Sequence, residues 1–110
     1  MQKMQISVYQ EPIAQQIASL ETERSKKLVL KELRYVPGVG KAIAHDLYDL
    51  GIRSIVDLEG KDPEYLYNKH CEKMGIRVDR CVLYVFRCAV YFASNRTYDP
   101  DLLKWWNWKD

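Results

Sequence analysis

The sequence predicts an all-α fold, a compact bundle of about five helices, and three observations lead to this prediction. Apolar residues recur roughly every three to four positions along most of the chain, which is the spacing that buries one face of a helix. No stretch alternates apolar and polar residues for long enough to indicate a β-strand. The chain of 110 residues is long enough for one hydrophobic core and too short for two.

The first third of the chain is predicted to contain an N-terminal arm and one helix. Residues 1–24 form the arm, in which a short helix is expected with Pro12 at its first position. The helical domain covers residues 25–110 and opens with a helix from about Ser25 to Tyr35, which contains neither glycine nor proline. Pro37 is expected to end this helix, because the residue before a proline is forced out of helical geometry.

Glycines and capping residues mark the ends of the next two helices. Helical spacing resumes after Gly40 and stops at Gly51, a residue type that favours the left-handed conformation at a helix C-terminus. Ser54 is expected to cap a short turn. A further helix starts at Asp62-Pro63, with the aspartate as cap, and ends at Gly75.

The last part of the chain contains the most apolar segment. A helix over about residues 78–94 is apolar nearly all round, so we expect it in the middle of the fold. Asp99-Pro100 starts a last short helix, which carries Trp105, Trp106 and Trp108. At least one of these indoles is expected to pack over the core, and another to stay exposed, where it could stack a base or anchor a partner.

Positive charge is concentrated near the first helix, although the net charge of the chain is only +2. The cationic side chains of this segment are Lys26, Lys27, Lys31, Arg34 and Lys41. Glu32 is the only acidic residue between Lys26 and Lys41. A basic region of this kind is typical of contact with a nucleic-acid backbone, although a solvated helix face has the same composition.

The segment Pro37-Gly38-Val39-Gly40-Lys41 carries the functional prediction. Its two glycines allow a tight reversal and leave no side chain between the backbone amides and an incoming phosphate. These amides lie at the start of the next helix, where unpaired N–H groups and the helix dipole favour an anion. The predicted phosphate-binding residues are therefore Gly38, Val39, Gly40 and Lys41, with Lys31 and Arg34 beside them.

Residues 33–48 resemble the helix-hairpin-helix motif of DNA repair glycosylases, ligases, nucleases and polymerases, whose hairpin holds phosphates without reading bases. Besides the glycines, the resemblance rests on apolar residues that should pack the two helices together: Leu33, Val36, Val39, Ala44 and Leu47. Residues 33–58, LRYVPGVGKAIAHDLYDLGIRSIVDL, also resemble the C-terminal domain of TfoX-type competence regulators. The motif would occupy about residues 25–50 of the helical domain.

A wider resemblance covers residues 28–110. The segments DPEYLYNKHCEKMG and VDRCVLYVFRCAVYFAS, followed by WWNWK, are similar to a small bacterial family of pathogenicity-locus, or mitomycin-resistance-like, helix-hairpin-helix proteins. This resemblance implies a bacterial cytoplasmic protein with a DNA-binding hairpin, and it implies no known reaction.

Metal and catalytic chemistry are not predicted. The three cysteines, Cys71, Cys81 and Cys88, lack the close pairs of a zinc site, so core packing as free thiols is the favoured interpretation over a metal cluster with His70. His45 has no nucleophile and orienting partner in the sequence and is expected to face solvent near the phosphate site. The chain is therefore expected to be no enzyme and to use no cofactor or metal.

Two arginines of the apolar helix are assigned structural roles. Arg80 is expected to pair with Asp79, its neighbour in the chain. Arg87 should either reach the surface or be satisfied by a buried carboxylate or carbonyl. Tyr84, Tyr91 and Phe92 on the same helix are expected to belong to the core.

Together these observations predict non-sequence-specific DNA binding, in which backbone amides of the hairpin contact phosphates. The alternative is a protein-interaction or self-association module whose hairpin is only structural and whose tryptophans dock a partner. Duplex DNA is the expected partner, together with a homodimer or a protein partner. No export signal or membrane span is found, and an odd number of cysteines fits a reducing compartment, so a cytoplasmic location is expected.

Overall fold

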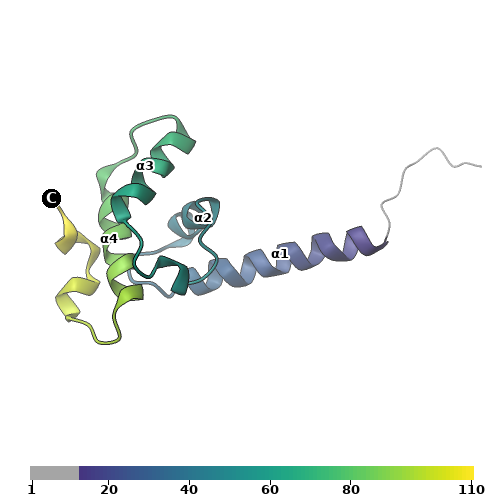
Figure 1. The fold of residues 1–110 in the computed structure, drawn as a ribbon, viewed down its shortest axis with the longest axis horizontal. Helices are drawn as coiled ribbons and strands as arrows, with labels where there is room; N and C mark the ends of the chain where they lie inside the picture. The colour runs from purple at the N-terminus through teal and green to yellow at the C-terminus, as the bar shows by residue number, and fades with distance from the viewer. Residues whose placement is uncertain (1–12) are drawn as a thin grey trace, which may run out of the picture.

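Residues 13–110, which the computed structural model describes, contain four α-helices and three short 3₁₀ helices (Figure 1). In chain order they are α1 (Ile13–Leu33), α2 (Lys41–Asp49), η2 (Val56–Leu58), α3 (Pro63–Met74), α4 (Arg80–Ser94), η3 (Pro100–Leu103) and η4 (Trp105–Trp108). No β-strand occurs over these residues, so the predicted all-α fold is confirmed.

The first helix differs from the prediction because α1 is continuous from Ile13 to Leu33. The sequence predicted two separate helices, a short one that starts at Pro12 and another that starts at Ser25. Pro12 itself lies outside the described residues. The predicted boundary between residues 24 and 25 lies inside α1. No glycine or proline interrupts α1, so nothing in the chain separates the two segments.

The predicted helix-end signals act as expected in the rest of the chain. The Asp62 carboxylate caps α3 by accepting the N–H of Glu64 at 2.9 Å, and Gly75 ends that helix with φ of 71°. Asp99 caps η3 in the same way by accepting the N–H of Asp101 at 3.0 Å. The last predicted helix is divided into η3 and η4, two 3₁₀ helices that pack on α4.

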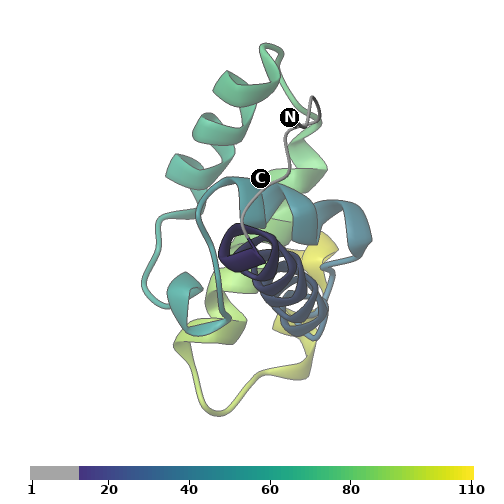
Figure 2. The same ribbon diagram turned by 90° about the vertical axis from the view of Figure 1, so that its right-hand side faces the viewer.

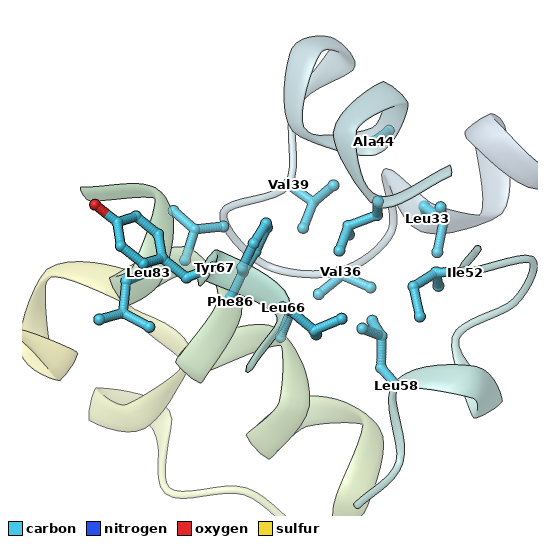
Figure 3. Close-up of a cluster of buried hydrophobic side chains, with 13 residues drawn as sticks. Leu33, Val36, Val39, Ala44, Ile52, Leu58, Leu66, Tyr67, Leu83 and Phe86 are labelled. Atoms are coloured by element: carbon cyan, nitrogen blue, oxygen red, sulfur yellow. The ribbon is translucent and has the colours of Figure 1, made fainter. Parts of the chain in front are cut away.

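The core forms around α4, which contacts α3, η2, η3 and η4. This confirms the central position predicted for the apolar helix. The five apolar residues expected to pack the first two helices together are all buried: Leu33, Val36, Val39, Ala44 and Leu47. Figure 3 shows Val36 and Val39 pointing into the same cluster as Leu66 and Phe86, so the α1–α2 connection is part of the core.

Only the C-terminal part of α1 joins this core. Figure 1 shows the rest of the helix extending away from the body of the protein, and Figure 2 views it nearly end-on. Ile13, Ile17 and Leu20 on the extending part are at least half exposed. The part that joins the body contacts α2, so the basic residues near the end of α1 lie beside the start of α2.

Candidate functional site

The connection between α1 and α2 covers residues 34–40 and holds its shape through its own backbone. The N–H of Tyr35 donates to the carbonyl of Glu32, and the N–H of Val39 donates to the carbonyl of Val36, each at 3.0 Å. The Val39 side chain is 5% exposed and faces inward, as predicted. Val39 therefore contributes to the turn and the core, and its N–H is not free for the predicted phosphate contact.

The two glycines of the connection differ in backbone conformation and in the space around them. Gly38 has φ of +84°, and a Cβ added to it would lie 3.2 Å from Cδ1 of Trp105. Its lack of a side chain thus serves backbone conformation and the packing of the indole, rather than access for a phosphate. Gly40 has φ of −93°, which any residue adopts, and an added Cβ would meet nothing within 4 Å. Gly40 is therefore the glycine at which the backbone is open.

The start of α2 presents unbonded backbone donors. Gly40 caps the helix without a side-chain hydrogen bond. Within residues 13–110, no acceptor is bonded to the N–H groups of Gly40, Lys41, Ala42 or Ile43. Unbonded amides at a helix N-terminus carry partial positive charge and favour an anion. Two of the four predicted hairpin donors, Gly40 and Lys41, belong to this group, and Ala42 is added to them.

The structure brings the predicted cations of α1 and α2 together. A groove of about 370 Å³ between the two helices is lined by Lys27, Leu30, Lys31, Arg34, Lys41 and His45. The spacing explains this grouping, because residues three and four apart share one face of a helix. Lys31, Arg34 and Lys41 were predicted as site residues, and His45 lies near them as expected.

The cations of this groove have no acidic partners among the described residues. Lys27, Lys31, Arg34 and Lys41 take part in none of the ion pairs found there. Glu32, the only acid of this stretch of sequence, is engaged elsewhere, because its carboxylate accepts the N–H of Ile55 at 2.7 Å. The groove therefore combines concentrated positive charge with the open start of α2.

The arginines of α4, unlike the cations of the groove, are paired with carboxylates. The predicted pair of Arg80 with Asp79 is wrong, because Asp79 caps α4 by accepting the N–H of Cys81 at 2.8 Å. Arg80 instead pairs with Asp110. The C-terminal segment returns over α4 and brings the Asp110 carboxylate to the start of the helix. Arg80 therefore binds Asp110, while Asp79 binds the N–H of Cys81.

Arg87 is bound by three groups that are far away in the sequence. Its guanidinium donates to the Trp108 carbonyl and to Glu64 at 2.8 Å each, and it lies 2.9 Å from Asp110. This agrees with the predicted alternative of satisfaction by a carboxylate or carbonyl, except that both carboxylates are about half exposed and not buried. Hydrogen bonds from Arg80, and then from Arg87, hold the pKa of Asp110 below its usual value.

The cysteines differ in environment and form no cluster. Cys88 is buried, and burial raises the pKa of its thiol to about 11. Cys81 is exposed and Cys71 is half-buried. Within the described part of the chain, no group of three or more His, Cys, Asp or Glu side chains stands close enough to hold a metal ion. His70 lies 3.6 Å from Asp46 of α2 and links α3 to that helix.

The three tryptophans divide as predicted. Trp105 packs against the core and against Gly38, and the indole N–H of Trp108 donates to the Leu102 carbonyl at 2.9 Å. Trp106 is 48% exposed and contacts the Trp105 ring edge-to-face. The sequence did not reveal that the tryptophan segment supports the α1–α2 connection, since the contact joins distant parts of the chain.

None of the described helices combines the length and the apolar character that crossing a membrane requires.

Over residues 13–110, the fold and the groove define a small all-α protein with cations between α1 and α2 that are unpaired within this range. Residues 26–110 match the model of the family described as pathogenicity locus, so the chain belongs to this family. It is 30% identical over 77 residues to mitomycin resistance protein McrB of Streptomyces lavendulae, and this similarity covers 70% of each protein. No solved structure matches the chain.

Proposed function

We propose that this protein binds the phosphate backbone of duplex DNA without reading its sequence, using α1, the connection and α2 as a helix-hairpin-helix motif. The observation that carries the proposal is the groove in which unpaired Lys27, Lys31, Arg34 and Lys41 lie together beside the open start of α2. The resemblance of residues 33–48 to that motif, and of residues 33–58 to TfoX-type regulators, belongs to the same proposal.

The first supporting argument concerns the backbone donors. A phosphate at the start of α2 would accept hydrogen bonds from the free N–H groups of Gly40, Lys41 and Ala42. It would also lie at the positive end of the helix dipole. Because Gly40 has open space where a side chain would be, a DNA strand could approach the main chain closely.

The second argument concerns the side chains that flank these donors. Four cations without acidic partners are available to neutralise neighbouring phosphates and release their counterions. Phosphate oxygens and backbone amides are the same for every base sequence, so contacts of this kind orient DNA without specifying sequence. The groove supplies only a few such contacts, and we therefore expect weak binding that falls steeply with salt.

The test is a titration of a blunt-ended fluorescent duplex at two salt concentrations, followed by fluorescence anisotropy. Lys41→Glu and Lys31→Glu should each weaken binding and lower the slope of log affinity against log salt by roughly one. Lys61→Glu is the matched control, because it makes the same change of charge at an exposed lysine outside the groove. Lys61 lies near Leu50, Gly51 and Ile52, beyond the C-terminal end of α2.

Three results would contradict the proposal. They are a wild-type protein that leaves the duplex unbound even at low salt, groove variants that bind as tightly as wild type, and a control variant that weakens binding as much as the groove variants do. No catalytic step and no cofactor are part of the proposal.

Self-association is a second candidate, favoured by a separate observation. The exposed side chains of Ile13, Ile17 and Leu20 follow one another at intervals of four and three residues and so share one face of the extending part of α1. An exposed apolar stripe of this kind indicates a contact surface. Light scattering on the samples used for the titration would show whether the protein is monomeric.

A further inference from the structure

Tyr35 differs from the other aromatic residues of residues 13–110. The remaining Tyr, Phe and Trp rings in this part of the chain each contact another aromatic ring or a cation. Tyr35 makes neither kind of contact, and it is 72% exposed. A large aromatic side chain held in solvent without a partner contributes little to the fold, so its ring is available for a ligand.

The surroundings of Tyr35 indicate what that ligand would be. The ring lines a pocket of about 320 Å³ with Lys31 and Arg34, and the same two cations also line the groove between α1 and α2. A nucleic-acid strand whose phosphates contact Lys31 and Arg34 would therefore carry its bases past the tyrosine. Lys31 and Arg34 form no ion pair among the described residues, so both charges are available to a polyanion such as a nucleic-acid backbone.

We propose that Tyr35 stacks against an unpaired nucleobase, so that the site prefers DNA with a single-stranded segment over a continuous duplex. The inference rests on the proposed phosphate-binding function and deepens it by naming the ligand. Bases inside a duplex are already stacked on each other and cannot cover the ring, whereas unpaired bases can. Every base presents a flat π surface, so stacking adds affinity without adding sequence specificity.

The backbone at Tyr35 supports such a contact. Tyr35 follows the end of α1, and its N–H is held by the Glu32 carbonyl at 3.0 Å, so the ring projects from a fixed point of the turn. Little conformational freedom of the main chain would be lost when a base binds. This preorganisation favours binding by a single exposed ring.

The experiment compares two fluorescent probes, an oligothymidine strand and a blunt-ended duplex of the same length, at one low salt concentration. Tyr35→Ala should weaken binding of the strand between about 5- and 100-fold and change binding of the duplex little. Tyr35→Phe keeps the ring and should bind the strand like wild type. Tyr65→Ala is the matched control, because Tyr65 is also an exposed tyrosine and lies on α3.

The outcomes separate this inference from the function on which it rests. If the duplex binds with the expected salt dependence but Tyr35→Ala binds the strand as tightly as wild type, base stacking is wrong and phosphate binding stands. Equal weakening for both probes, or an equal loss in Tyr35→Phe, would also overturn stacking. If the wild-type protein binds neither probe, both proposals fail. Tyr35 is exposed, so circular dichroism should show all variants folded like wild type.

Discussion

Two groups of cations in this protein have opposite surroundings. On α4, Arg80 and Arg87 are engaged by Asp110, Glu64 and the Trp108 carbonyl. Across α1 and α2, the four cations of the groove have no acidic partner among the described residues. The difference teaches that the number of basic residues says little about ligand binding, because carboxylates delivered by other segments decide which cations are left for a ligand.

The reason lies in how the chain returns on itself. The C-terminal segment folds back along α4 and delivers a carboxylate to both arginines. No segment within residues 13–110 delivers one to the groove, and the Glu32 carboxylate accepts the N–H of Ile55. The arginines of α4 thus join the C-terminal segment to the body of the protein, whereas the cations of the groove form no such link in the described part of the chain.

The largest expected effect tests this contrast directly. Arg87→Ala removes the hydrogen bonds of a side chain that is 19% exposed and leaves Glu64 and the Trp108 carbonyl without this donor, so unfolding should require about 2 kcal/mol less free energy. Lys31→Ala should change stability by less than about 0.5 kcal/mol, because Lys31 forms no ion pair within residues 13–110. Urea unfolding measures both values. Equal destabilisation by the two variants would show that the contrast between the cation groups is wrong.

The two glycines of the connection allow a second test that separates a structural role from a binding role. Gly38→Ala forces a side chain into positive φ and against Trp105, so we expect a loss of about 1–2 kcal/mol of stability. Gly40→Ala should leave stability nearly unchanged but weaken duplex binding, since its methyl group would stand between the backbone and a phosphate. Thermal unfolding and the anisotropy titration report the two effects. A stable Gly38→Ala protein would argue against the packing role assigned to that residue.

The smallest expected effect concerns pH. The pKa of Asp110 is held below its usual value by the arginines of α4, so the aspartate stabilises the folded state at pH above its unfolded pKa. This contribution is lost as the pH falls from about 4 through the lower folded pKa, because the carboxylate is then protonated in both states. The melting temperature of wild type should approach that of Asp110→Asn over this acidic range and exceed it at neutral pH. Equal melting temperatures at neutral pH would contradict the role of Asp110.

Local features of this protein could be predicted because they depend on near neighbours in the chain. Asp62 and Asp99 cap helices whose first residues follow them directly, and Gly75 ends α3 through its own backbone conformation. The burial of Val36 and Val39 followed from their spacing around the glycines. Helix continuity was the exception, since the sequence predicted a break in α1 where no residue causes one.

The sequence by itself determined the all-α fold, most helix ends and the cations of the groove, because helix periodicity and capping act within a few residues. Only the tertiary structure decided which charges are paired. Arg80 meets Asp110 across 30 positions, and Glu32 meets the N–H of Ile55 across 23. The same holds for Trp105, which occupies the space beside Gly38. Such contacts depend on the paths of the connecting segments, and these paths follow from packing of the whole core rather than from any short stretch of sequence.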